Sequence, residues 1–201
     1  MNNFINKIVN KIIKIFYREV VLEIAYLSLE NDLNYTSGES CKIRMIEKKD
    51  FPALAERFGT FKIEKFTQWI NNSYGYMIIN QGKIAGYCWA SPNLSYKEGI
   101  EPFVFDVNPK KGNIYLFDAY IHPDSRRTQV ISIFAPYLIN DLKERGYKKC
   151  FYFYNKNNVL MKEHVTPMLG FKSNEKIVYR RFFVFIVKDM KALSRYCVSE
   201  D

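Results

Sequence analysis

The feature that constrains this chain most is a helix placed between two apolar strands in its second half. Residues 113–121 read as a strand, and residues 150–154 form a continuous apolar run. Between them, apolar side chains recur at helical spacing from Val130 to Leu142, and Gly146 is suited to cap that helix in the left-handed conformation. Consecutive buried strands joined by a helix are typical of a parallel pair in one sheet. The pattern therefore predicts an α/β fold rather than a β-sandwich.

The remaining residues from 41 to 201 supply further elements of one domain, with a mixed sheet flanked by helices. Asn80-Gln81-Gly82-Lys83 separates two short β runs and predicts a hairpin with a tight turn. The long connection from Ser91 to Lys111 contains three prolines. A further strand at 102–107 is an open alternative within it. The other predicted elements are a strand at 42–46, helices at 49–58 and 63–70, hairpin strands at 76–79 and 84–89, a helix at 158–165, and a last hairpin with strands at 177–179 and 182–187.

Residues 1–40 have a different sequence pattern and are expected to form an N-terminal amphipathic helical arm with a linker at 35–40. Apolar residues recur at helical spacing over roughly residues 3–31, while Lys7, Lys11, Lys14 and Arg18 lie largely off that stripe. One interpretation packs the arm on the body of the protein or on a second copy as a homodimer. The other lays it on an anionic membrane surface.

Composition excludes several classes of protein. With 201 residues and 48% apolar content the chain is globular, and no uncharged apolar run reaches the roughly 20 residues of a membrane-spanning helix. Four scattered cysteines and two distant histidines favour a reduced, cytoplasmic protein without a metal, peripheral at the inner membrane face if the arm binds lipid. A net charge of +9 suits an anionic partner, but no run of five like charges marks a nucleic-acid tail. Nucleic acid is therefore the weaker choice.

Three short motifs stand out in this domain. The first is the run from Tyr120 to Arg127, in which a strand end is followed by proline and arginine. The second is Asn157-Asn158 after an apolar strand, followed by Leu169-Gly170-Phe171. The third is the end of the early hairpin, Gly86-Tyr87-Cys88-Trp89. Together, in their order along the chain, these motifs resemble the GNAT superfamily of acyl-CoA-dependent N-acetyltransferases. The resemblance covers the chain from Cys41 to Val187 and implies a GNAT-like fold for it.

The resemblance also implies acetyl-CoA as co-substrate and assigns residues to it. Pantetheine would pair with backbone groups where two parallel strands splay apart, and pyrophosphate would bind the turn that opens a helix, because backbone N–H groups and the helix dipole converge there. Asn157 or Asn158 would reach the cofactor from the other side. The residues implied for the pantetheine are Ala119, Tyr120 and Ile121, and those for the pyrophosphate are Arg126, Arg127, Thr128, Gln129, Val130, Ile131 and Ser132.

The sequence departs from the family at two places. Gln129 and Ile131 stand where the family turn has glycines, and Pro136 allows the following helix to begin either at Arg127, with proline in its interior, or near Ser132. Thr166 stands where many members have the tyrosine that protonates the leaving thiolate. A reshaped phosphate turn is therefore expected.

The predicted catalytic residues are Asp118, Tyr120 and His164. The resemblance implies Asp118 as the general base, because the family commonly uses a carboxylate on or near this strand. Strand alternation would place it with Tyr120 and His122 on one face, opposite Phe117. The alternative for these two residues is structural. Asp118 would form an ion pair with a nearby basic residue, and Tyr120 would pack against its neighbours. His164 has an imidazole suited to proton transfer, although a lone histidine on a short helix is also an ordinary surface residue.

The resemblance implies direct acetyl transfer to an amine acceptor, either a small molecule or a protein. A backbone N–H near Tyr120 or Ile121 would stabilise the oxyanion. The alternative is a catalytically inactive relative that binds acyl-CoA or a protein, and a nucleic-acid-binding module is the third choice.

Overall fold

A computed structural model describes residues 17–34, 41–92, 96–100, 103–126, 128–183 and 185–198. Eight of its strands form one mixed sheet in the order β10-β9-β1-β8-β7-β4-β3-β2, and β5 and β6 form a separate hairpin. The strands are β1 (Tyr17–Ser28), β2 (Cys41–Met45), β3 (Tyr74–Asn80), β4 (Lys83–Ser91), β5 (Tyr96–Ile100), β6 (Phe103–Val107), β7 (Asn113–Ile121), β8 (Lys149–Asn155), β9 (Lys172–Phe182) and β10 (Phe185–Asp189).

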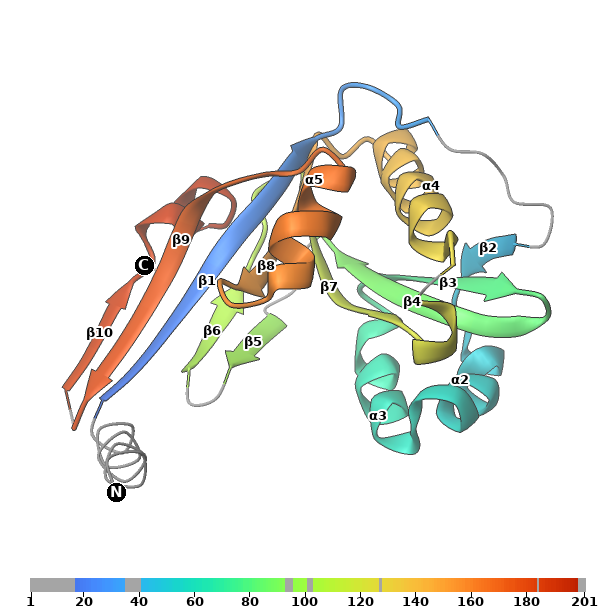
Figure 1. Cartoon of the computed structure of the whole chain (residues 1–201), viewed down its shortest axis with the longest axis horizontal. Helices are drawn as coiled ribbons and strands as arrows, with labels where there is room; N and C mark the ends of the chain where they lie inside the picture. Colours follow the sequence, from blue (N-terminus) through green and yellow to red (C-terminus); the bar gives the residue numbers. More distant parts are fainter. Residues whose placement is uncertain are drawn as a thin grey trace, which may run out of the picture.

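Helices cover both faces of the half of the sheet that carries β2, β3, β4 and β7. Figure 1 shows α4 (Val130–Glu144) on one face, and α2 (Phe51–Phe58) and α3 (Thr60–Trp69) on the other. Phe66 and Trp69 of α3 pack their rings on Trp89 of β4. The short helical elements are η1 (Lys48–Asp50), η2 (Pro123–Ser125), the π-helix η3 (Leu160–Val165), α5 (Thr166–Met168) and η4 (Lys191–Arg195). The predicted mixed sheet flanked by helices is confirmed.

Both hairpins predicted from the sequence are present. Strands β3 and β4 pair up to Asn80 and Lys83, so the connection has only two residues, Gln81 and Gly82. Both have positive φ, at 50° and 75°, as a type I′ turn requires. The last hairpin also forms, with Phe185 of β10 paired to Phe182 of β9. Its first strand is longer than predicted, since β9 runs from Lys172 to Phe182. Phe182, which was predicted to begin the second strand, is the last residue of β9, and β10 begins at Phe185.

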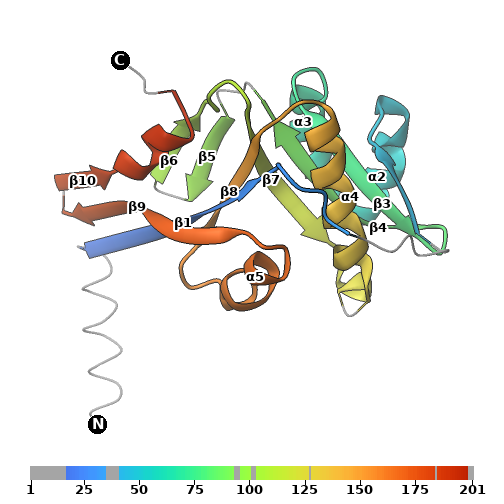
Figure 2. The same cartoon turned by 90° about the horizontal axis from the view of Figure 1, so that it is seen from above.

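The prediction of a helix over residues 3–31 is wrong for residues 17–28. They form β1, an interior strand that pairs antiparallel with β8 on one side and β9 on the other, as Figures 1 and 2 show. All six residues from Val20 to Ala25 are buried, so the segment is enclosed on both faces of the sheet. A short apolar run enclosed on both faces does not reveal its period, and here long-range pairing overrode the helical spacing. Residues 1–16 and the predicted linker at 35–40 lie outside the described residues.

Helix α4 begins at Val130, between the two starts that the sequence allowed. Pro136 therefore lies inside the helix and is buried. Since proline lacks the N–H that would bond to the carbonyl of Ser132, the helix loses one backbone hydrogen bond there. Its end follows the prediction, because Gly146 has a φ of 88° and its N–H bonds to the carbonyl of Lys143. The two strands that α4 joins are β7 and β8, which run parallel as predicted.

The long proline-bearing connection contains the β5–β6 hairpin, so the strand left open at 102–107 exists as β6. Phe105 of β6 packs its ring 5.4 Å from that of Phe153 in β8. The helix predicted at 158–165 is a π-helix over Leu160–Val165. It runs on into α5, and Pro167 lies inside that short helix instead of following its end. Within the described residues, no helix has the length and apolar character needed to cross a bilayer.

Candidate functional site

The two parallel strands at the centre of the sheet pair only at their beginnings. Residues 113–115 of β7 pair with residues 149–151 of β8, yet β7 continues to Ile121 and β8 to Asn155. A cavity of about 720 Å³ opens where the strands part. Residues of β7 and β8 form its two side walls, and Thr128, Ile131, Phe134, Ala135, Leu138 and Ile139 contribute from α4 and the turn before it.

A β-bulge on β7 shapes one wall of this cavity. Tyr87 of β4 pairs with Tyr120, but Trp89, two residues on, pairs with Phe117, so that Asp118 and Ala119 together face one residue of β4. Asp118 itself has a φ of 43°, a left-handed conformation that is uncommon for a residue other than glycine.

A glycine lets β4 approach this bulge closely. A Cβ atom on Gly86 would lie 2.7 Å from the carbonyl oxygen of Tyr120 and 2.5 Å from Cδ1 of Ile121. Any side chain at this position would push β4 away from the strand end that carries the bulge. One of the residues that carry the family resemblance therefore has a specific steric function next to the cavity.

The carboxylate of Asp118 reaches the α3 side of the sheet. Its Oδ1 atom lies 2.5 Å from Nζ of Lys62, and both side chains are less than one fifth exposed. Its Oδ2 atom is buried and forms no hydrogen bond, as is also true of the hydroxyl of Tyr87. Burial, with Asp118 nearby, raises the pKa of Tyr87 well above its ordinary value. Asp118 thus pairs with a base, as its structural alternative held, and it is also one of the residues that line the cavity.

The bulge also changes which residues share a face. Tyr120 packs on Tyr87 and on Phe58 of α2, and the ring of His122 lies 6.0 Å from that of Phe58. The predicted grouping of Asp118, Tyr120 and His122 on one face therefore agrees with these contacts. Phe117 was expected on the opposite face, and this is wrong: its ring lies 5.0 Å from Trp69 of α3. The extra residue in the bulge breaks the strict alternation on which that expectation rested.

The opposite wall carries hydroxyl groups that sequence reasoning missed. The hydroxyl of Tyr152 on β8 lies 2.7 Å from that of Thr166. The hydroxyl of Tyr154 donates to a carboxylate oxygen of Glu23 on β1 at 2.7 Å and lies 2.9 Å from the hydroxyl of Ser173. Burial raises the pKa of Tyr152 to about 12 and also raises that of Tyr154. The sequence gave no signal of this arrangement, because Tyr152 and Tyr154 lie in an apolar strand that looks like part of the core.

The turn between β7 and α4 is built without glycine. Arg126 donates from Nε to the carbonyl of Ile121 at 3.1 Å and lies over the ring of Tyr120. The hydroxyl of Thr128 donates to the carbonyl of Ser125 and accepts from the N–H of Val130.

Gln129 has a φ of −75°, a conformation that any residue adopts. Among the described residues of the turn, which exclude Arg127, none has positive φ. The backbone path of the described turn residues therefore needs no glycine, and the reshaping of the turn relative to the family stays a prediction.

The remaining predicted site residues divide between the cavity and the surface. Ile131 lines the cavity, whereas Gln129 and Ser132 are exposed and do not. Asn158 lies at the cavity and accepts a hydrogen bond from the N–H of Met161. Asn157 and His164 are exposed and absent from the cavity wall, so His164 is not brought together with Asp118 and Tyr120.

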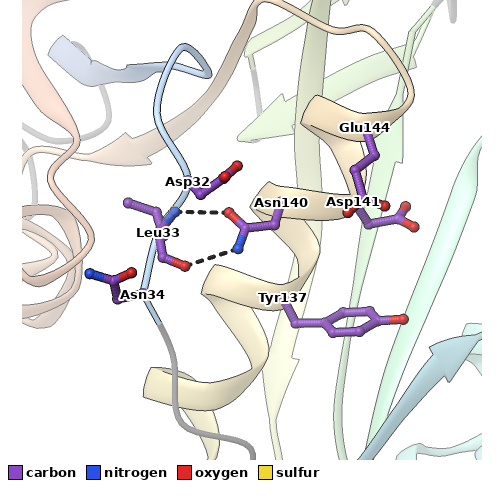
Figure 3. Close-up of a pocket in the computed structure, with 7 residues that line it drawn as sticks. All are labelled: Asp32, Leu33, Asn34, Tyr137, Asn140, Asp141 and Glu144. Atoms are coloured by element: carbon purple, nitrogen blue, oxygen red, sulfur yellow. Dashed lines mark hydrogen bonds between the residues drawn. The ribbon is translucent and has the colours of Figure 1, made fainter.

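A second hollow of about 420 Å³ lies between α4 and the segment after β1 (Figure 3). There the side-chain amide of Asn140 binds both the N–H and the carbonyl of Leu33 at 2.9 Å, which ties that segment to the helix. Asp32 and Asp141 border it, but each already forms an ion pair, with Lys143 and Arg145 respectively. In the described part of the chain, no group of three or more His, Cys, Asp or Glu side chains could hold a metal ion.

A comparison of the sequence with known protein families identifies one family. A family model described as the acetyltransferase (GNAT) family matches residues 42–162, more than half of the chain. The chain therefore belongs to the GNAT family of acetyltransferases. No curated protein matches the sequence.

Solved structures agree on the fold. A GCN5-related N-acetyltransferase from Sphaerobacter thermophilus matches with a TM-score of 0.58 and 12% identity, over 88% of this chain and 56% of its own. A tandem GNAT protein from the clavulanic acid biosynthesis pathway gives 0.59 and 12%, over 81% of this chain and 53% of its own. A GNAT-family protein from Novosphingobium aromaticivorans gives 0.53 and 12%, over 86% and 66%. The chain thus spans little more than half of the first two structures, and at such identity the likeness concerns the fold alone.

Proposed function

We propose that this protein is an N-acetyltransferase that transfers an acetyl group from acetyl-CoA to an amine by direct attack. The observation that carries the proposal is the cavity at the point where β7 and β8 part, beside the start of α4. A strand edge released from its neighbour offers backbone groups to an amide-rich chain. Pantetheine is such a chain, and Ala119, Tyr120 and Ile121 of β7 lie along this edge.

The start of α4 supports a pyrophosphate site at the cavity mouth. This helix has 15 residues, so its dipole and first N–H groups favour an anion there. The positive charge of Arg126 lies beside the same turn. Because the turn follows negative φ throughout its described residues, backbone donors can converge without the glycines typical of the family.

Asp118 and Tyr152 stand on opposite walls of the cavity and suit opposite proton transfers. Asp118 is the proposed base that takes a proton from the amine, directly or through water, with its unpartnered Oδ2 atom. The neutral nitrogen then attacks the thioester carbonyl, and a backbone N–H near Tyr120 stabilises the oxyanion. Tyr152 is the proposed donor to the leaving thiolate, because its hydroxyl meets Thr166, the position where many relatives carry a tyrosine.

The second candidate is a relative that binds acyl-CoA without catalysis. The ion pair that Asp118 forms with Lys62 favours this alternative, since an amine of the protein already holds one oxygen of the proposed base. Both candidates require the cofactor to bind, and only the first predicts turnover.

The test is isothermal titration of acetyl-CoA together with turnover of a panel of small amines and lysine peptides. Ala119→Trp should abolish binding, because Ala119 lines the cavity and is exposed to it. Ala53→Trp is the matched control, since Ala53 is exposed on α2 away from the cavity. Binding to the control but not to Ala119→Trp supports the site. No binding to the wild-type chain overturns the acyltransferase, and binding without turnover of any amine favours the inactive relative.

A further inference from the structure

The tip of the β9–β10 hairpin exposes a concentration of large apolar side chains. Phe182, Phe183, Phe185, Ile186 and Val187 are each between 53% and 72% exposed. Every residue of β10 is exposed, so neither face of this edge strand is covered in the described structure. Soluble proteins seldom expose so many neighbouring apolar groups without a binding partner. Figure 1 shows this tip at the end of the sheet far from α2, α3 and α4.

Residues paired across β1, β9 and β10 form successive rungs at the tip, first an aromatic rung and then a basic one. The outermost rung joins Tyr17 of β1, Phe182 of β9 and Phe185 of β10. The next rung, one residue or roughly 3.3 Å behind it, joins Arg18, Arg181 and Ile186. An aromatic end with guanidinium groups directly behind it matches the boundary between the acyl chains and the headgroups of a bilayer.

The sequence around the tip lacks negative charge. Residues 180–188 contain three basic residues and no acidic residue. Behind the two outer rungs, Glu19 binds Arg180 at 2.6 Å, so the nearest carboxylate is already paired. The apolar and basic groups therefore gather at one end, away from the proposed acetyl-transfer site.

We propose that this hairpin tip binds the surface of a membrane that contains anionic lipids, with Phe183 and Phe185 inserted and Arg18 and Arg181 at the headgroups. A second copy of the chain fits less well, because joining two tips would bring together two stretches, residues 180–188, that each carry three basic residues and no acidic residue. The inference does not depend on the proposed enzymatic function.

The experiment is cosedimentation of the full chain with phosphatidylcholine vesicles, with and without phosphatidylserine. Wild-type protein should bind only the anionic vesicles, and added salt should release it. The pair Phe183→Ser and Phe185→Ser should weaken binding roughly ten- to a hundredfold, since two inserted rings are lost. Phe61→Ser is the matched control, because Phe61 is 62% exposed on α3 at a distance from the tip. Arg18→Ser should weaken binding about fivefold.

A second measurement keeps the test decisive if the double variant Phe183→Ser and Phe185→Ser fails to fold. Phe185→Trp should show a blue shift and quenching by brominated lipid on adding anionic vesicles, while the buried Trp69 and Trp89 report no change. Three results would overturn the inference: no binding to anionic vesicles, equal loss from Phe61→Ser, or loss of binding through Ile8→Ser and Ile12→Ser with none from the tip pair. A dimer that the tip pair dissociates, without vesicle binding, would assign the surface to a second copy instead.

Discussion

The two walls of the central cavity use different chemistry to hold their polar groups. On the β7 wall, a bulge directs Asp118 toward α3, where a charged pair with Lys62 forms. On the β8 wall, Tyr152 and Tyr154 are held by neutral hydroxyls and one buried carboxylate, that of Glu23. The first wall thus holds a carboxylate and the second holds neutral hydroxyl groups. In the proposed reaction these are the base and the acid, on opposite sides of the cavity.

The largest expected effect tests the β7 wall. Asp118→Asn should lower kcat by about 100- to 1,000-fold, because the amide cannot take a proton from the amine. Binding of acetyl-CoA should change little, as titration will show. Asp32→Asn is the matched control, since Asp32 also pairs with a lysine, at 2.7 Å, but lies in the second hollow. Unchanged turnover in Asp118→Asn would remove the base assignment and leave the ion pair as a structural feature.

The next effect tests the β8 wall. Tyr152→Phe should lower kcat by about ten- to a hundredfold, because the leaving thiolate loses its proton donor. An acetyl thioester of an aromatic thiol should restore much of the rate, since that thiolate leaves without a proton. Tyr154→Phe provides the comparison, and should affect stability more than kcat because its hydroxyl binds Glu23. Equal loss of kcat from both variants, without thioester rescue, would mean that Tyr152 only maintains the packing of β8.

A third prediction measures how the charged pair stabilises its wall. Lys62→Met should reduce the free energy of unfolding by about 1–3 kcal/mol, because the Asp118 carboxylate stays largely buried without its partner. Lys65→Met on the same helix is exposed and should have an effect near zero. Urea denaturation of the two variants gives the difference. Equal stabilities would show that solvent already screens the pair.

The smallest effect concerns pH. Burial raises the pKa of Tyr152, Cys88 and Cys197 to about 12, from ordinary values of 10.0 for the phenol and 9.0 for the thiols. These groups stay neutral in the folded chain while the unfolded chain ionises them, so their stabilisation is complete below pH 9 and is lost as pH rises toward 12. Urea unfolding at pH 8 and pH 11 should show the loss. Tyr152→Phe should reduce that loss by about 1 kcal/mol, and an identical loss in this variant would refute the assignment.

The difference between prediction and structure is clearest where neighbours in space are distant in sequence. The β3–β4 hairpin, α4 and its glycine cap follow from local turn chemistry and local spacing, and all three formed as expected. The cavity-lining positions Ala119 to Ile121 lay on the predicted strand. The pairing of Asp118 with Lys62 joins residues 56 positions apart, and that of Tyr154 with Glu23 joins residues 131 apart. Neither pairing has a local pattern that a sequence could display.

The sequence by itself determined the βαβ unit and the motifs of the family resemblance, because each rests on periodicity or on turn residues close together in the chain. The splayed strands were expected from that resemblance and not from any local pattern. Only the tertiary structure decided that residues 17–28 are a strand, since an apolar run takes the conformation that its neighbours complete. It likewise decided where Asp118 points, because one extra residue in a bulge turns a side chain in a way that depends on the register with β4.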